Sequence, residues 1–232
     1  MYPLSKPSNR LIVIKNKEIR DIINSVHVDQ TALERTEMAF DTYIHGNPLI
    51  RWLMWARLRA TIDFAAIEEN SEVLDFGCGF GLLLPTLASF TKKVYAIDLF
   101  PQYAKKLVER KHMDVNFIDS VSSVKDGSLN IIFATDVLEH LDDPEEIINL
   151  FRGKLASNGQ LIISGPTETI IYRIGRVLAG WHKKGEYHHW NIKDIKLMCE
   201  KNDFKLIKTK RLPFPFLPSL FYVLSFSKRD NI

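Results

Sequence analysis

Short apolar runs alternate with amphipathic runs between residues 72 and 167. Five of the apolar runs are rich in Val, Ile and Phe: EVLDF, KVYAID, DVNFID, LNIIFATD and QLIISG. The amphipathic runs between them have helical spacing: GLLLPTLASF, PQYAKKLVERK and PEEIINLFRGKLA. This alternation predicts right-handed crossovers and a largely parallel sheet with helices on both faces. The expected fold class is therefore α/β, doubly wound and Rossmann-like.

The residues before this region predict a helical extension. Residues 1–30 mix charged and aliphatic positions without a clear period, and we expect a loose or peripheral segment there. Residues 31–66 have helical spacing. In their second half one side of the expected helix is apolar: Leu49, Trp52, Leu53 and Ala56. We therefore expect residues 1–66 to form an N-terminal helical extension of a main domain that spans residues 67–232.

The pattern changes again after Gly165. A probable amphipathic helix, ETIIYRIGRVLAGW, is followed by the polar stretch HKKGEYHHW. We expect this part, around residues 168–190, to be an insert that faces the substrate. A further helix, IKDIKLMCEKN, leads to two runs that we interpret as antiparallel edge strands, FKLIKTKRL and FYVLSFSK.

Composition excludes few functions but sets the compartment we expect. The chain has 232 residues, a formal net charge of +3 and two cysteines. The mild charge does not indicate a nucleic-acid partner, and the scarcity of cysteine suits a reducing compartment. No apolar run is long enough to cross a membrane. We expect a cytoplasmic protein, with peripheral contact at the inner membrane face left open.

The stretch VLDFGCGFG, residues 73–81, places three glycines where the first expected strand ends. Ligands of such sheets bind at the carboxyl ends of the strands, so the glycines allow a ligand to approach the backbone. A dinucleotide would favour a G-x-G-x-x-G spacing, whereas here the third glycine, Gly81, comes one residue early. The alternative is an adenosyl group with an amino-acid tail. Asp75 favours this cationic ligand, since a carboxylate would repel a pyrophosphate.

Two further acids follow the next two expected strands. Asp98 ends KVYAID, where a carboxylate can accept hydrogen bonds from both ribose hydroxyls. Asp119 ends DVNFID and is placed to meet the exocyclic amine of an adenine. The other interpretation is that both carboxylates cap the helices that follow. Three acids at the ends of successive strands, together with one glycine-rich turn, form a specific combination. The ligand interpretation is therefore favoured.

The chain resembles the class I S-adenosylmethionine-dependent methyltransferases of the type 11 group. Five stretches carry the resemblance, in order and spacing: VLDFGCGFG, VYAID, FIDS, IIFATDVLEHLDDP and GQLIISGPT. The resemblance implies a seven-stranded sheet with one reversed strand. It also implies that S-adenosylmethionine is the cofactor, with the methionine part at the glycine turn. The implied cofactor-binding residues are Asp75, Gly77, Cys78, Gly79, Asp98, Leu99, Asp119, Ser120, Thr135 and Asp136.

The segment DVLEHLDD offers groups that could act on a methyl acceptor. If residues 136–140 form a turn of helix, Asp136, Glu139 and His140 share one face. A hydroxyl acceptor needs a base or a metal to take or acidify its proton. The catalytic candidates are His140, Glu139, Asp136 and His189. A divalent metal such as Mg or Zn would be held by Asp136, Glu139, His140 and His188; the alternative is that His140 lines the acceptor pocket without a metal.

This arrangement is similar to metal-assisted O-methyltransferases, which include ubiquinone-pathway enzymes and small-RNA 2′-O-methyltransferases. The stretch HGNPLIR also resembles an HxxNPLR segment of the ubiquinone-pathway enzymes, with one residue inserted before the arginine. In those enzymes the arginine approaches the cofactor, which points to Arg51 here.

The acceptor is expected to be a small or lipid-like molecule with a hydroxyl group. Residues 170–181 have an amphipathic pattern with basic neighbours, which suits either a lid over an apolar pocket or an interfacial helix on anionic lipid. Two other functions stay open. One is a regulatory protein that binds S-adenosylmethionine or S-adenosylhomocysteine without catalysis, and the other is RNA 2′-O-methylation. The sequence leaves the oligomeric state undetermined.

Overall fold

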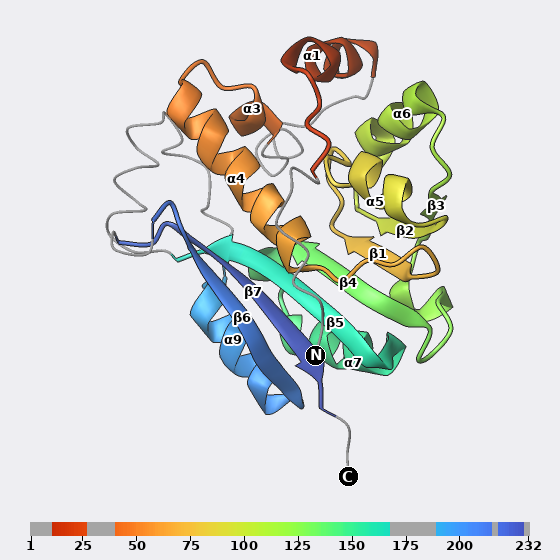
Figure 1. The fold of residues 1–232 in the computed structure, drawn as a ribbon, viewed down its shortest axis with the longest axis vertical. Coiled ribbons are helices and arrows are strands. Elements are labelled where there is room, and N and C mark those ends of the chain that lie inside the picture. Colours follow the sequence, from red (N-terminus) through yellow and green to blue (C-terminus); the bar gives the residue numbers. More distant parts are fainter. Residues whose placement is uncertain (1–10, 27–39, 168–188, 215–217, 230–232) are drawn as a thin grey trace.

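The computed structural model describes residues 11–26, 40–167, 189–214 and 218–229. In this described part, seven strands form one sheet in the order β3-β2-β1-β4-β5-β7-β6 (Figure 1). The strands are β1 Glu72–Phe76, β2 Lys93–Ile97, β3 Asn116–Phe117, β4 Leu129–Thr135, β5 Leu155–Pro166, β6 Phe204–Leu212 and β7 Phe221–Lys228. Strands β1 to β5 pair in parallel, and β7 runs antiparallel to both of its neighbours. The expected doubly wound sheet with one reversed strand is confirmed.

Helices cover both faces of this sheet (Figure 1). On one face lie α1 Asn16–Ser25, α3 Phe40–Tyr43, α4 Pro48–Phe64, α5 Leu84–Phe90 and α6 Gln102–Lys111. On the other lie α7 Pro144–Lys154 and α9 Ile192–Lys201, together with the short 3₁₀ turns η1 Val121–Ser123 and η2 Leu138–His140. Strand β1 shows why both faces need cover: Val73 enters the first core and Leu74 the second, because successive strand residues point to opposite faces.

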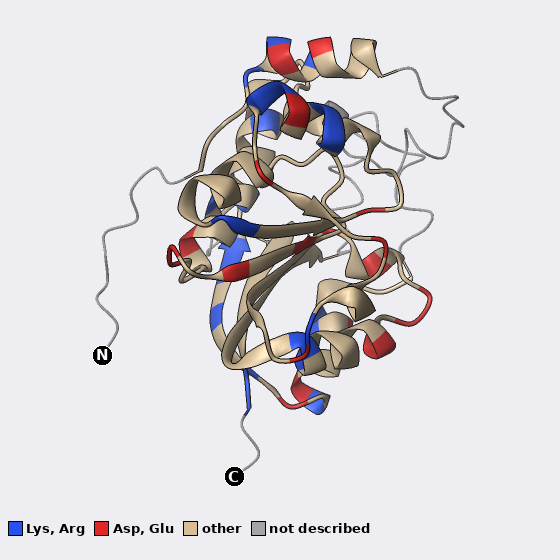
Figure 2. Cartoon of the chain, turned by 90° about the vertical axis from the view of Figure 1, so that its right-hand side faces the viewer, with Lys and Arg blue, Asp and Glu red and all other residues tan. Residues whose placement is uncertain are grey.

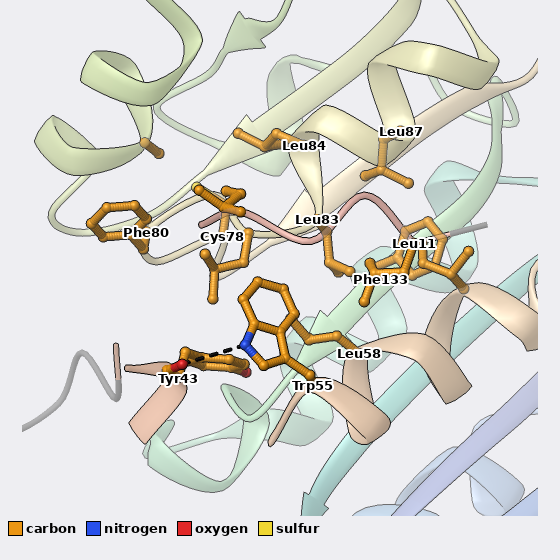
Figure 3. Close-up of a cluster of buried hydrophobic side chains, with 14 of the residues drawn as sticks. Leu11, Tyr43, Trp55, Leu58, Cys78, Phe80, Leu83, Leu84, Leu87 and Phe133 are labelled. Carbon is orange, nitrogen blue, oxygen red and sulfur yellow. Dashed lines mark hydrogen bonds between the residues drawn. The ribbon is translucent and has the colours of Figure 1, made fainter. Parts of the chain in front are cut away.

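The first core joins the N-terminal helices to the start of the main domain. Trp55 of α4 packs edge-on against Tyr43 with ring centroids 5.3 Å apart, and its Nε1–H donates to the Tyr43 carbonyl at 3.3 Å (Figure 3). Leucines of α5 and Phe133 of β4 belong to the same cluster (Figure 3). Burial of large apolar groups of this kind stabilises a fold by about 1.5–3 kcal/mol each.

Three expectations about the periphery are wrong. Residues 11–25 are not loose, since Ile19 and Ile22 are fully buried against the first core. Of the two C-terminal strands only β6 is an edge, because β7 inserts between β5 and β6. The apolar side expected for α4 is exposed at Leu49 and Trp52, while Arg57 is buried. The physical reason is that Arg57 has a carboxylate partner inside the fold.

Part of the expected organisation lies outside the described residues: the first half of the 31–66 run, the insert around 168–190 and the amphipathic pattern at 170–181. Among the described helices, none combines the length and apolar character needed to cross a bilayer. Lys and Arg are interspersed with Asp and Glu over most of the described chain (Figure 2).

Candidate active site

A cavity of about 470 Å³ opens at the carboxyl ends of β1, β2 and β4. Ten residues that the sequence nominated line it: Asp75, Gly77, Cys78, Gly79, Asp98, Leu99, Asp119, Thr135, Asp136 and His140. They come from four separate stretches of the chain. The parallel register brings the stretches together, because all four follow strands that end at the same edge of the sheet.

The glycine turn is pinned to the end of β2. The backbone N–H groups of Gly77 and Cys78 both donate to the carbonyl of Ile97, at 2.9 and 3.0 Å. Gly77 has a φ of +70°, and a Cβ added there would lie 2.4 Å from a methyl of Val137. Gly79 has a φ of +53° and faces open space. The turn therefore needs glycine for two reasons: close packing at the first position and left-handed backbone beside the cavity at both.

Asp75 is a buried acid that the described protein groups leave incompletely satisfied. Its side chain is 1% exposed, and within the described residues its Oδ1 atom has no hydrogen-bond partner. Burial, and then the negative charge of Asp98, raise its pKa from 3.8 to about 7. A cation placed in the cavity beside Asp75 would restore the ionised carboxylate and supply the missing partner. The part of the cavity beside Asp75 is therefore suited to an ammonium group.

The Asp98 carboxylate accepts hydrogen bonds from two loop segments, and it does not cap α6, whose N-cap residue is Pro101. Its Oδ2 accepts a hydrogen bond from Gly79 N at 2.7 Å, and its Oδ1 accepts one from Phe100 N at 2.8 Å. It also lines the cavity, and each carboxylate oxygen keeps a second lone pair for a ligand hydroxyl. Leu99, which is 86% exposed, stands beside it at the cavity wall. An apolar side chain next to a carboxylate suits a nucleoside, which has a flat base and a hydroxylated ribose.

The cavity lining also contains a charge network around Arg57 that sequence reasoning missed. Arg57 of α4 is 3% exposed, and its Nη2 lies 2.6 Å from Asp136 Oδ2. The same Nη2 donates to the Tyr43 hydroxyl at 3.0 Å, while Ser164 Oγ donates to the other oxygen of Asp136 at 3.4 Å. Burial raises the pKa of Tyr43, an effect that the Arg57 charge opposes. The charges of Arg57 and Asp136 cancel, and the Tyr43 hydroxyl keeps its proton at neutral pH.

A family model described as a methyltransferase domain matches residues 51–209, which is well over half of the chain. This chain belongs to the class I S-adenosylmethionine-dependent methyltransferases. The matched region contains the cavity walls from α4 to η2, including the glycine turn and the three strand-end acids.

Curated relatives of this methyltransferase are ubiquinone biosynthesis O-methyltransferases. The protein of that name from Xanthomonas euvesicatoria pv. vesicatoria (strain 85-10) is 33% identical over 104 residues, covering 41% of this chain and 43% of the relative. The one from Xanthomonas oryzae pv. oryzae (strain PXO99A) is 33% identical over 114 residues, covering 45% of each. The match thus spans less than half the length of these relatives.

Solved structures show the same fold at low sequence identity. The N-methyltransferase NodS from Bradyrhizobium japonicum WM9, in complex with S-adenosyl-L-homocysteine, superposes with a TM-score of 0.63 and 18% identity, covering 86% of this chain and 97% of that one. A SAM-dependent methyltransferase from Aquifex aeolicus gives a TM-score of 0.62 at 18% identity, covering 84% and 97%. These neighbours support the fold of the methyltransferase and do not identify its acceptor.

The structure of this methyltransferase separates the residues that were expected to share one helical face. Asp136 has a φ of +53°, so it precedes the 3₁₀ turn η2 instead of starting a helix. Both Asp136 and His140 line the cavity. Glu139 is 3% exposed and is not among the residues that line the cavity; its Oε1 lies 3.7 Å from where a Cβ of Gly165 would stand. The structure therefore gives no support to a catalytic role for Glu139, which stays a prediction.

The proposed metal set is not assembled within the described residues. No group of three or more His, Cys, Asp or Glu side chains there is arranged to hold a metal ion. The carboxylate of Asp136 is already paired with Arg57, and His188 lies outside the described residues. The described residues of the expected set therefore do not fit a divalent metal.

Three other nominated residues do not reach the cavity. His189 is half exposed, with its Nε2 3.8 Å from Asp142 and its backbone N–H on the Glu139 carbonyl. The Ser120 hydroxyl accepts from Ser122 N and caps η1. Arg51 donates to the carbonyls of two preceding residues at the start of α4. The arginine of α4 that lines the cavity is Arg57, six residues later, so the assignment of Arg51 is wrong.

Cys78 lines the cavity but is not a nucleophile. Its side chain is buried, and burial followed by the charges of Asp75 and Asp98 holds its pKa well above the usual thiol range. A protonated thiol of this kind is unreactive. Its role is to fill the tight turn between Gly77 and Gly79.

We expect Asp75→Asn to flatten the pH dependence of the free energy of unfolding. The folded carboxyl keeps its proton up to about pH 7, whereas the unfolded one loses it near 3.8. The contribution of Asp75 to the free energy of unfolding should therefore fall between about pH 4 and pH 7, by at most about 1.4 kcal/mol per pH unit, and level off above. Urea unfolding at several pH values measures this slope. Asp142→Asn, at a fully exposed position, is the matched control; equal slopes in the wild type and the Asp75 variant would contradict the assignment.

Arg57→Leu should destabilise the protein by about 3 kcal/mol, because it leaves the Asp136 carboxylate partly buried without its guanidinium. The double variant Arg57→Leu, Asp136→Asn should be more stable than the single one, since neither unpaired charge remains. Thermal and urea unfolding of the four proteins in this cycle measure the coupling. Additive changes would show that the two side chains do not interact in solution.

Proposed function

We propose that this methyltransferase transfers the methyl group of S-adenosylmethionine to a hydroxyl group of a small or lipid-like molecule. The observation that carries the proposal is the combination of polar groups that line the cavity. The unsatisfied Asp75, the glycine turn and Asp98 line the same cavity as His140 and the Arg57–Asp136 pair. The first group suits an amino-acid nucleoside, and the second group suits an acceptor that must give up a proton.

Asp75, the glycine turn and Asp98 each fit one part of the cofactor. Asp75 would bind the ammonium of the methionine part, and the left-handed backbone at Gly79 leaves room for the tail. Asp98 would accept hydrogen bonds from the ribose hydroxyls. Leu99 and Asp119 would lie beside the adenine ring. When bound, the cofactor supplies an electrophilic methyl group on its sulfonium. Fixing donor and acceptor in line then contributes about 7–11 kcal/mol of barrier reduction.

We assign His140 as the base that removes the proton of the acceptor hydroxyl. Asp136 is a weak candidate for a base, because Arg57 and Ser164 both hold its oxygens. An imidazole is a suitable proton acceptor near neutral pH, and that of His140 stands in the cavity wall. The buried Arg57 and Tyr43 keep this wall rigid, and they orient the carboxylate beside it.

The remaining lining suits an apolar acceptor. Phe80, Leu83, Val137 and Leu141 contribute to the cavity walls. Small-molecule sites are typically apolar with a few fixed polar groups, which is the composition seen here. The names of the curated relatives, ubiquinone biosynthesis O-methyltransferases, point to an oxygen acceptor as well. The formal net charge of +3 for the whole chain gives little support to an RNA acceptor.

His140→Ala should lower kcat by about 10²–10⁴-fold, the usual contribution of a positioned acid–base group, and leave cofactor affinity unchanged. Steady-state kinetics and calorimetry with S-adenosylhomocysteine measure the two quantities separately. His189→Ala, at a half-exposed position away from the cavity, is the matched control and should keep wild-type turnover. Wild-type turnover in the His140 variant would remove this residue from the mechanism.

The acceptor class can be tested with a panel of methyl acceptors. With labelled S-adenosylmethionine, a prenylated catechol should give an O-methyl ether that mass spectrometry identifies, and faster than the same catechol without its prenyl chain. A primary amine of matched size should not react. N-methylation would overturn the proposed acceptor. Cofactor binding without transfer to any acceptor, including those of a cell extract, would favour the regulatory alternative.

A further inference from the structure

Three large apolar side chains are exposed together where α4 begins and β6 ends. Leu49 is 66% exposed, Trp52 41% and Phe214 42%. The rings of Trp52 and Phe214 lie 5.8 Å apart between centroids, tilted by 30°. Two segments that are distant in sequence thus present one apolar surface, which we call the aromatic corner. Contiguous exposed apolar groups of this kind mark an interaction site more often than scattered ones do.

The register of the sheet places the aromatic corner at the same edge as the cavity. Leu212, at the end of β6, pairs with Phe221 of β7, and Phe221 pairs with Pro166, the last residue of β5. The parallel strands end at this edge, where the cavity opens. Phe221 also carries the Arg57 guanidinium, whose carbon lies 4.6 Å from the ring centroid. Phe221 thus pairs with the end of β6 and also contacts Arg57, which lines the cavity.

The sequence from Phe204 to Arg229 is basic, with six basic residues and no Asp or Glu. Lys208, Lys210 and Arg211 lie in the half of β6 that leads to the aromatic corner. Lys205, Lys228 and Arg229 lie at the far end of β6 and β7. This run contrasts with the mixed charges of the rest of the described chain (Figure 2). Such a local excess of positive charge attracts an anionic surface.

Two of these lysines share the face of the sheet on which α4 lies. The Lys208 ammonium lies 5.6 Å from the ring centroid of Phe64, at the end of α4. Lys210 points to the same side, because side chains alternate along a strand and its partner Val223 packs into the core beneath α4. Both lysines are exposed. They form a basic row along β6 that runs toward the aromatic corner.

We propose that the aromatic corner and the Lys208–Lys210 row form a docking surface for an anionic lipid bilayer. Tryptophan and phenylalanine insert at the level of the lipid headgroups, while the lysines meet the headgroup charge. Neither signal alone holds a protein on a membrane firmly, but two adjacent ones do. The proposal concerns binding and holds for any acceptor. Where the acceptor is lipid-like, as proposed above, docking turns the cavity edge of the sheet toward the bilayer.

The test is flotation of the purified full chain with vesicles of phosphatidylglycerol and phosphatidylcholine, and with vesicles of phosphatidylcholine alone. Binding is expected to the anionic vesicles only, and to weaken as salt is raised. Lys208→Glu, Lys210→Glu should reduce the partition coefficient by at least about tenfold, and Trp52→Ser, Phe214→Ser should reduce it similarly. No cofactor or acceptor is present, so the result does not depend on methyl transfer.

Matched variants on the opposite helix serve as controls. Leu197→Ser removes an equally exposed apolar side chain from α9, and Lys193→Glu reverses an exposed charge there. Both should bind vesicles like the wild type, and circular dichroism should show all variants folded. Absence of wild-type binding, equal binding to neutral vesicles, or equal losses in the controls would overturn the proposal. A dimer in sedimentation that Trp52→Ser, Phe214→Ser dissolves, without vesicle binding, would assign the corner to a second copy instead.

Discussion

The buried pair of Arg57 and Asp136 is the interaction on which the arrangement of this methyltransferase depends. It joins α4, which precedes the sheet in sequence, to the turn after β4, over a distance of 2.6 Å. A guanidinium that is almost wholly buried is tolerated only when its charge and its N–H groups are matched. Asp136 supplies the opposite charge, and the Tyr43 hydroxyl accepts a hydrogen bond from the same Nη2 group. The pair therefore fixes where α4 lies, and with it one wall of the cavity.

The other wall depends on a different constraint, the close approach of backbone to side chain at the glycine turn. A side chain at Gly77 would overlap Val137, so this turn and the segment after β4 are fitted to each other. The same turn leaves Asp75 buried beside Asp98 with a raised pKa. A cationic ligand beside Asp75 would stabilise the ionised form of this carboxyl. The packing that buries Asp75 therefore also makes the site suited to a cation.

The reversed strand β7 connects the chemistry to the surface. Because β7 runs antiparallel, its first residue, Phe221, lies at the edge where the parallel strands end. Its ring lies 4.6 Å from the guanidinium carbon of Arg57, and it pairs with Leu212 at the end of β6. Phe214 follows two residues after Leu212 and lies next to Trp52. The order of the strands thus brings the exposed aromatic surface close to the residue that supports Arg57 in the cavity wall.

The sequence determined the features whose cause is local. Alternating apolar runs determine strands and helices, and the spacing of glycines and acids along them determines which strand ends line the cavity, so Asp75, Asp98, Asp119 and His140 were found in advance. The tertiary structure decided what depends on contacts between distant segments. No local pattern distinguishes Arg57 from Arg51, or shows that Tyr43 lies beside the cavity, because only the packing of α4 on the sheet selects them. Likewise, Asp136 has a left-handed backbone, and its N–H donates a hydrogen bond to the Ser164 carbonyl on the neighbouring strand β5. With this backbone Asp136 does not start a helix, so Glu139 does not share a helical face with it.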